Sequence, residues 1–339
     1  MGRSLGEREA MIAQCKHAVR IVMAAVLIGV IALVGEVGAG EEQATVTIAT
    51  GRVGGLYHPV RGVICKLASE NLGEHGVSCT VDISGGSIPN IKDLRKGNDD
   101  LAIVQSDLQH DAFAGTGPFE DEGPFENLRS MFALYVEDFT VVARDDRDID
   151  SFDDLKGKRV YVGQAASSRR EAMDVLMEVH DWKGGEIISV SEFEGANLAE
   201  ALCDGEFDAF VYTIGHPNPT VREATTLCDA KLVGISAPKI EKLKKENPFY
   251  LGSLIPSGTY KGMSQDVPTL AIVATLVTTA EAPPNVIYEI TKAYFENLEI
   301  LQALSPLFLS LTKGEMVETG LSAPIHEGAL KYFSEAGLK

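Results

Sequence analysis

The sequence predicts a mixed α/β fold, and three observations support this prediction. Apolar strand-like runs alternate with helical patterns from residue 44 onward, which is the order that builds parallel sheets with helices on both faces. Three of the expected strands end in glycine-rich segments that lead into a helix. The chain has 339 residues, 45% of them hydrophobic, which is enough for two packed domains at roughly 150 residues each and excludes wholesale disorder.

The first series of elements has short β-branched strands separated by helical periodicity. The expected elements are a strand at 45–50, a helix at 57–72, a strand at 77–83, a helix at 87–97 and a buried strand at 101–105. Gly97 is the residue type that closes a helix. The loop at 115–128 follows and is rich in Gly, Pro and acidic residues; we interpret its acid cluster as solvated surface.

A second series of elements shows the same alternation of strands and helices. It comprises a strand at 159–163, a helix at 167–179, a strand at 186–190, a helix at 196–205 and a strand at 208–213. Two longer extended runs, 131–144 and 269–279, have no partner nearby in the sequence, so we expect them to pair with each other and to run between two lobes. An amphipathic helix from Pro284 to about Leu304 and a helix at 326–336 complete the chain, and His326 is expected to cap the second of these.

The first 39 residues do not belong to this pattern. Four basic residues precede an uncharged apolar run at 21–35, and Val37-Gly38-Ala39 follow it. A basic start, a short apolar centre and small residues at a cleavage site are typical of a secretory signal peptide. The fifteen apolar residues are fewer than the ~20 that span a bilayer, although an uncleaved anchor is an open alternative. We therefore expect residues 1–39 to be a signal peptide and the chain to be exported.

The charge balance limits the partners. The whole chain has a formal charge of −19, and removal of residues 1–39, with four basic and three acidic side chains, leaves −20. This excess argues against nucleic acid and anionic lipid as partners, because phosphate binding requires clustered Lys and Arg. An anionic ligand gains nothing from the global field, so any anion site must be built locally.

The spacing of the cysteines predicts a structural role for them and not a catalytic one. Cys65, Cys79, Cys203 and Cys228 follow the predicted signal peptide, and four cysteines in an exported protein permit two disulfides in three connectivities. The local pairings, 65–79 and 203–228, are the simplest. The cysteines lack CxxC spacing and a zinc pattern, and the sequence lacks a G-x-S-x-G elbow. We expect no metal, no cofactor and no enzymatic activity.

The glycine-rich strand ends predict a ligand site. These ends are Gly51 to Gly55, Ser84 to Ser87, and Gly163 to Arg169. Helix N-termini attract anions through their unpaired N–H groups, and ligands of open α/β sheets bind beyond the carboxyl ends of strands. Any one of the three could be only a tight turn. Together, from two sub-sheets, they predict a ligand held between two lobes.

A dinucleotide enzyme is the weaker alternative. The first glycine segment reads G-R-V-G-G instead of G-x-G-x-x-G, although Asp82 ends the next strand at a distance suited to a ribose.

Several segments closely resemble the TAXI family of extracytoplasmic solute receptors of TRAP transporters. They are ATGRVGGLYHPVRG, GGSIPNIKDLRKGNDDLAIVQSDLQHDAFAGTGPF, LYVEDFTVVAR, SFDDLKGKRVYVG, DGEFDAFVYTIGHPNP, IPSGTYKG and APIHEGALKYFSEAG, in family order across residues 44–339. The resemblance implies a type II periplasmic binding protein-like fold with a ligand cleft between two lobes. It also implies a periplasmic location and delivery of a small organic acid to a TRAP membrane subunit. We expect a monomer; a receptor that serves a sensory system is the alternative.

The expected organisation follows from this resemblance and from the two long strands. Lobe I would comprise residues 44–137 plus 276–339, and lobe II residues 138–275. The strands at 131–144 and 269–279 would be the hinges.

The resemblance also implies ligand-binding residues at positions that match the family's pocket. The matching residues are Gly54, Gly55, Tyr57, Ser87, Gln105, Ser106, Glu137 and Ser167. From the chemistry of their side chains and backbone, we add Arg52, Gln164, Ser168, Arg169 and Tyr212. Backbone N–H groups and two guanidinium groups would hold carboxylates. Arg52, Ser168 and Arg169 replace residues expected from the family, so the ligand could be glutamate, glutamine or a 2-oxoglutarate-like dicarboxylate.

Overall fold

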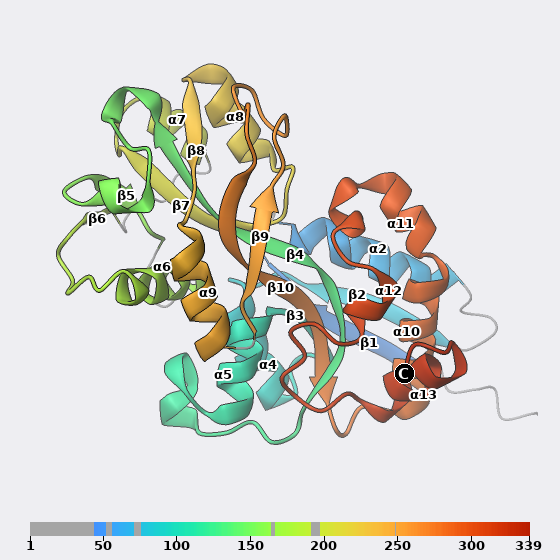
Figure 1. Cartoon of the computed structure of the whole chain (residues 1–339). Coiled ribbons are helices and arrows are strands. Elements are labelled where there is room, and N and C mark those ends of the chain that lie inside the picture. The colour runs from blue at the N-terminus through green and yellow to red at the C-terminus, as the bar shows by residue number, and fades with distance from the viewer. Residues whose placement is uncertain (1–43, 52–55, 71–75, 164–166, 191–196, 248) are drawn as a thin grey trace, which may run out of the picture. The chain divides into compact units, whose positions relative to one another are not determined.

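A ten-stranded sheet forms the centre of the protein. The computed structural model describes residues 44–51, 56–70, 76–163, 167–190, 197–247 and 249–339; the predicted signal peptide, residues 1–39, lies outside these ranges. Residues 44–339 form one compact unit. The strand order is β2-β1-β3-β10-β4-β7-β5-β6, with β8 paired to β4 and β9 paired to β10 (Figure 1).

The first part of the sheet has the predicted βαβ order. Its elements are β1 (Ala44–Ala49), α2 (Tyr57–Glu70), β2 (Val77–Asp82), α4 (Ser87–Lys96), β3 (Leu101–Gln105) and α5 (Ser106–Ala114). β1 pairs in parallel with β2 and with β3. α4 ends at Gly97, whose φ of 72° is left-handed, as the sequence predicts. Gly117–Glu122 forms a 3₁₀ turn in the predicted loop.

The second part of the sheet is also parallel, because β5 pairs with both β6 and β7. Its elements are β5 (Arg159–Tyr161), α6 (Ser168–Val179), β6 (Ile188–Val190), α7 (Leu198–Cys203), β7 (Ala209–Ile214), α8 (Pro219–Leu227), β8 (Ala230–Val233), α9 (Ala237–Glu246) and β9 (Leu251–Ile255). The sequence pattern predicts no element between β7 and the long strand at 269–279. In α9 only Ile240 and Leu243 of the ten residues are buried, so the segment contains no long apolar run that would mark it.

Two long antiparallel strands join the two parts. β4 (Leu128–Arg144) and β10 (Val267–Thr279) pair along their length, which confirms the predicted pairing of the two extended runs. β10 also pairs with β3, and β4 also pairs with β7. Figure 1 shows both strands running from the part that contains β1 and β3 to the part that contains β7 and β8.

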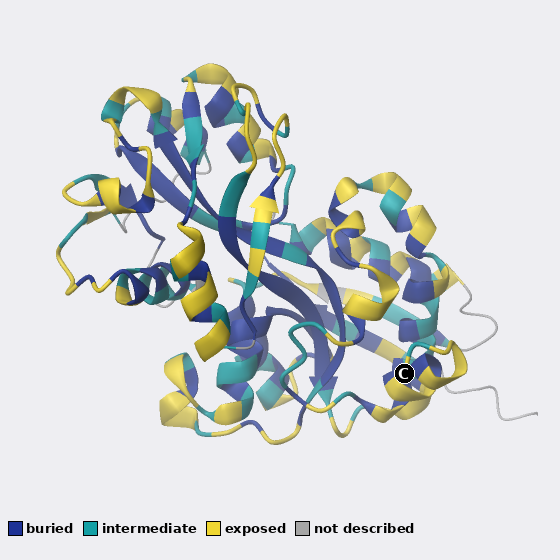
Figure 2. Ribbon diagram, viewed as in Figure 1, coloured by how far each residue is buried: buried dark blue, intermediate teal, exposed yellow. Residues whose placement is uncertain are grey.

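Alternating side chains of each strand are buried under helices on opposite faces of the sheet. On β3, Leu101 and Ile103 join the cluster under α2 and α10 (Pro284–Glu296), whereas Val104 joins the cluster under α4 and α5. On β7, Val211 packs with residues of α6 and α9, whereas Phe210 packs with residues of α7 and α8. Figure 2 shows the central strands as almost entirely buried. This architecture, two parallel sets linked by two long antiparallel strands, confirms the predicted type II periplasmic binding protein-like α/β fold.

The first of the two predicted C-terminal helices is shorter in the structure than the sequence predicts. The helix predicted from Pro284 to Leu304 is divided into α10 and α11 (Leu298–Leu304) at Asn297, whose side-chain amide donates to the Ala293 carbonyl. The chain continues through Pro306–Leu309, α12 (Lys313–Met316) and α13 (Glu327–Glu335). His326 caps α13 by accepting from the Gly328 N–H, as expected. Within the described ranges, no helix is both long and apolar enough to span a membrane.

The structure contains two disulfides. Cys65 on α2 is joined to Cys79 on β2, and Cys203 at the end of α7 is joined to Cys228 after α8. Of the three connectivities that the sequence permits, this is the local one. The first bond joins a helix to the strand that follows it, and the second joins the C-terminal ends of two helices.

Asn90 on α4 joins the loops that follow β1 and β2 to strand β3. Its side-chain nitrogen donates to the carbonyls of Thr50 (2.5 Å) and Ile103 (2.8 Å), and its side-chain oxygen accepts from the Ser84 hydroxyl. Asn90 is fully buried, so its loss removes three hydrogen bonds from a dry environment.

We expect Asn90→Ala to lower the free energy of unfolding by about 2–3 kcal/mol, because buried hydrogen bonds are lost. Urea denaturation monitored by circular dichroism measures this change. The matched control is Asn98→Ala, since Asn98 is exposed and should change stability by about 0.5 kcal/mol or less. Equal effects of the two substitutions would contradict the assigned role of Asn90.

Candidate functional site

A pocket of about 170 Å³ lies where several strands end. Its walls come from the loops after β1 and β2, from the ends of β3 and β7, and from the middle of β4. The lining residues are Gly51, Leu56, Tyr57, Gly85, Gly86, Ser87, Gln105, Glu137, Tyr212, Thr213 and Ile214. The pocket therefore contains residues from both parts of the sheet, and parallel strands bring their carboxyl ends to it.

Glu137 is the charged group of this pocket and is held by polar neighbours. Its Oε2 accepts from Gln105 Nε2 at 2.9 Å and from the Tyr57 hydroxyl at 3.4 Å. The Ser87 hydroxyl accepts from the Gln105 N–H at 3.1 Å and lies 3.5 Å from the Tyr57 hydroxyl. Gly86, with a φ of 117°, brings the chain into α4 so that Ser87 occupies its first turn. The first three predicted strands thus build one connected network.

Burial raises the pKa of Glu137 to about 8. The hydrogen bond from Gln105 opposes this shift, and the negative charge of Asp107 adds to it. The side chain is 3% exposed, so ionisation of the empty site carries a desolvation cost. A ligand that brings a positive group or hydrogen-bond donors would offset that cost.

Two polar atoms of the pocket have no protein partner among the described residues. They are the Gln105 side-chain oxygen and the Thr213 hydroxyl oxygen, both buried. Buried polar atoms are usually satisfied by protein, water or ligand. Since Gln105 uses its nitrogen to bind Glu137, its oxygen is available as an acceptor beside that carboxylate.

Arg169 approaches the pocket from α6. Its guanidinium carbon lies 4.3 Å from the ring centre of Tyr212 and 5.2 Å from that of Tyr161. Tyr212 lines the pocket, so the arginine is stacked against its wall and does not simply extend into solvent. Gly163, with a φ of 83°, is required here, because a Cβ would come within 3.2 Å of the Arg169 side chain.

The structure brings together five of the predicted site residues. Tyr57, Ser87, Gln105, Glu137 and Tyr212 line the pocket. Of the remaining predicted residues, Arg52, Gly54, Gly55 and Gln164 lie outside the described residues. Ser167 caps α6 by accepting from the Arg170 N–H. Ser168 begins α6, and its side chain lies outside the described part.

Ser106 is a correction. Its hydroxyl donates to the Phe249 carbonyl at 3.3 Å and accepts from the Val273 N–H at 3.2 Å. Both partners are backbone groups away from the pocket, and Ser106 is not among the lining residues. The Ser106 hydroxyl therefore fastens α5 to β10 and lies outside the lining of this pocket.

Three side chains that line the pocket are not among the residues predicted from the sequence: Leu56, Thr213 and Ile214. Thr213 and Ile214 end the predicted strand β7. The rule that ligands bind beyond the carboxyl ends of strands could have found them, but no glycine-rich segment marks this end. Leu56 follows the glycine-rich segment before α2, and its apolar side chain does not indicate a ligand site.

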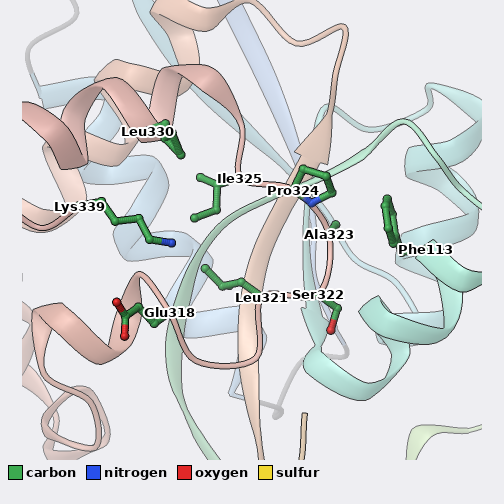
Figure 3. Close-up of a pocket in the computed structure, with 9 residues that line it drawn as sticks. All are labelled: Phe113, Glu318, Leu321, Ser322, Ala323, Pro324, Ile325, Leu330 and Lys339. Carbon is green, nitrogen blue, oxygen red and sulfur yellow. The ribbon is translucent and has the colours of Figure 1, made fainter. Parts of the chain in front are cut away.

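A larger hollow of about 470 Å³ lies elsewhere, between the C-terminal segment and α5. Figure 3 shows its wall formed by Glu318, residues 321–325, Leu330 and Lys339, with Phe113 of α5 on the opposite side. Its neighbouring polar groups are satisfied, since the N–H groups of Ser322 and Ala323 donate to Gln109. None of its described side chains is a buried polar group without a partner, so the smaller pocket is the better candidate.

The described residues contain no group of three or more His, Cys, Asp or Glu side chains that could hold a metal ion. His216, from the GHPNP turn, is bonded to the Thr140 hydroxyl at 2.8 Å and to the Tyr260 hydroxyl at 2.5 Å. Burial lowers its pKa to about 4. The polar groups that the pocket offers are the buried carboxyl group of Glu137, the Gln105 amide and the hydroxyl groups of Tyr57, Ser87, Tyr212 and Thr213.

Comparisons with known proteins concern the family and the fold of the whole chain. A sequence model of the NMT1-like family matches residues 48–337. A solved structure of a protein from Bordetella bronchiseptica RB50 is similar over 87% of this chain and 98% of that chain, with a TM-score of 0.54 and 14% identity. This likeness concerns the fold.

Two further solved structures are similar at lower TM-scores. The GluR0 ligand-binding core from Nostoc punctiforme, in complex with (L)-glutamate, is 16% identical over 78% of this chain and 100% of that chain, with a TM-score of 0.44. The alkanesulfonate-binding protein SsuA from Xanthomonas axonopodis pv. citri, bound to MOPS, is 15% identical over 78% and 81%, with a TM-score of 0.44.

The raised pKa of Glu137 predicts a pH dependence of stability. The folded-state pKa of about 8 lies above the ordinary value of 4.5, so the empty folded protein binds more protons than the unfolded chain between these pH values. The free energy of unfolding then falls as the pH rises through this window, at about 1.4 kcal/mol per pKa unit. Glu137→Gln cannot ionise and should escape this loss.

We therefore expect the Tm of Glu137→Gln minus that of the unsubstituted protein to increase from pH 5 to pH 8, measured by thermal unfolding without ligand. Glu299→Gln, at an exposed position of α11, is the control and should keep a constant difference. A constant difference for Glu137→Gln as well would show that Glu137 ionises normally.

Proposed function

The chain belongs to the NMT1-like family, and from that premise we propose that it is an exported solute receptor that binds a small organic acid. It is a binding protein and not an enzyme. The observation that carries this proposal is the pocket between the two parts of the sheet, in which Glu137 and the unpartnered oxygen of Gln105 lie side by side.

The polar groups of the pocket support an amino acid as the ligand. An ammonium group could donate to Glu137 and to the Gln105 oxygen together, and it would lower the desolvation cost of the ionised carboxylate. The described lining residues include no Lys or Arg, so a second carboxylate placed beside Glu137 would face an acid. Glutamate or glutamine therefore fits this end of the pocket better than a 2-oxoglutarate-like dicarboxylate.

The carboxylate of the ligand would bind at the helix N-termini. α4 begins at the pocket with Ser87, and Arg169 of α6 is stacked on Tyr212. Free N–H groups and a guanidinium attract carboxylates. Arg52, Gly54, Gly55, Gln164, Ser167 and Ser168 remain part of this proposal, as they follow strand ends in the sequence.

The size of the ligand is consistent with useful affinity. Micromolar binding requires about −8 kcal/mol, and a ten-atom amino acid stays below the ceiling of roughly −1.5 kcal/mol per heavy atom. Closure of two lobes, 44–137 plus 276–339 and 138–275, about β4 and β10 would bury the ligand. Delivery to a TRAP membrane subunit from the periplasm is supported by the segments that resemble the TAXI family across residues 44–339.

A matched ligand pair tests the role of Glu137. Glutamate and 2-oxoglutarate differ at the α-amino group, so Glu137→Gln should weaken glutamate binding at least about tenfold, the loss of one charge-assisted contact, and leave 2-oxoglutarate binding unchanged or improved. Isothermal titration calorimetry at pH 7 measures both. Tighter binding of 2-oxoglutarate by the unsubstituted protein would reject the amino-acid assignment. A thermal-shift screen in which only sugars raise the Tm would reject the organic acid altogether.

Neighbouring arginines give a matched test of the carboxylate end. Arg169→Gln should weaken glutamate binding about tenfold, because Arg169 is stacked on the pocket wall. Arg170→Gln is the control: Arg170 pairs with Asp174 at 3.0 Å and donates to Ser189, and its substitution should change affinity less than about twofold. If both variants bind like the unsubstituted protein, Arg169 is not a ligand group.

A further inference from the structure

A second cavity, of about 370 Å³, lies between α5, α6 and α9. It is separate from the Glu137 pocket, and no residue lines both. The side chains that line it include five carboxyl groups and one ammonium group. The charged residues are Asp107, Asp111, Glu171, Glu178, Glu246 and Lys242.

Four of the five carboxyl groups of this cavity have no basic partner within 4 Å in the part of the chain that the structure describes. Among the described residues, only Asp111 has a basic group within 4 Å, His110 at 3.6 Å. Burial, and then repulsion from Asp111, raises the pKa of Asp107 to about 7. Burial, and then repulsion from Asp174 and Asp111, also raises the pKa of Glu171. Carboxylates of α5 and α6 thus repel one another across the cavity.

Tyr250 is an independent sign of a missing ligand. The residue lines the cavity and is only 6% exposed, yet its hydroxyl makes no hydrogen bond to any described residue. Burial, and then the charges of Asp107, Asp111 and Glu171, raises the pKa of this hydroxyl, which places it among the carboxylates. Tyr250 is therefore a largely buried polar residue of the cavity wall whose hydroxyl can still take a hydrogen-bond partner.

The remaining walls suit an organic cation. The rings of Phe249 and Tyr250 lie 4.7 Å apart at their centres and both line the cavity, and aromatic faces attract ammonium groups. Apolar side chains from all three helices complete the lining: Leu108, Val175, Val179 and Leu243. The described residues offer no cluster suited to a metal ion, which favours a cation that carries its own alkyl group.

We propose that this cavity binds a small organic ammonium ion. The ammonium group pairs with the carboxylates of Asp107 and Glu171. The Tyr250 hydroxyl oxygen accepts a hydrogen bond from it, and the alkyl part packs on Val175 and Leu243. Because Asp107 belongs to α5 and Glu171 to α6, the bound cation relieves the repulsion between these helices.

The test uses n-butylammonium chloride as the probe, with isothermal titration calorimetry on the purified full chain at constant ionic strength. Sodium butyrate, of the same length and opposite charge, and sodium chloride are the control ligands. We expect saturable binding of n-butylammonium with a stoichiometry of one, and no binding of either control. Absence of saturable n-butylammonium binding, or equal binding of butyrate, overturns the proposal.

Variants locate the site. Glu171→Gln should weaken n-butylammonium binding at least about fivefold, and Tyr250→Phe about threefold. Glu299→Gln, at an exposed position of α11, should change it less than about twofold. If Glu171→Gln does not fold, Glu178→Gln replaces it with an expected loss of about twofold or more. Equal losses in the Glu299→Gln control indicate non-specific attraction to an acidic surface and overturn the proposal.

Discussion

The pairing of β4 with β10 is the constraint on which the rest of the structure depends. β10 also pairs with β3 of the first part of the sheet, and β4 also pairs with β7 of the second part, so these two strands join the parts. Most side chains of both strands are buried, and burial on two faces requires the long apolar β-branched runs seen in the sequence. Glu137 lies opposite Ile272 in this pairing. A carboxyl group at this position is fixed by the sheet itself and reaches the pocket without depending on a loop.

Keeping acids at buried positions has a cost in stability. Glu137 and Asp107 are 3% and 6% exposed, and burial is the largest cause of both raised pKa values. Apolar residues of similar volume would remove this cost. Gln105 and Tyr57 stabilise the ionised form of Glu137 only in part. Groups that are costly in the empty protein and become favourable when a complementary ligand is present are characteristic of binding sites.

The sequence predicted those features that local patterns encode. β-branched runs located β1, β3, β4 and β10, and Gly97 and His326 marked helix ends where the structure has them. The segment from α8 to β9 was not predicted, because α9 exposes most of its residues and its place is set by tertiary contacts. Thr213 was missed for a related reason: a threonine at a strand end becomes part of a site only when Glu137 and Gln105, distant in sequence, fold against it.

Three consecutive residues lie between the two cavities. Gln105, Ser106 and Asp107 each have a different environment. Gln105 lines the pocket of Glu137, Asp107 lines the acidic cavity, and Ser106 between them is bonded to the Phe249 carbonyl and the Val273 N–H. The start of α5 is thereby fixed to β10 and to the loop that carries Tyr250. Gln105 ends β3 and Asp107 lies in the first turn of α5, so the same strand-to-helix junction supplies a side chain to each cavity.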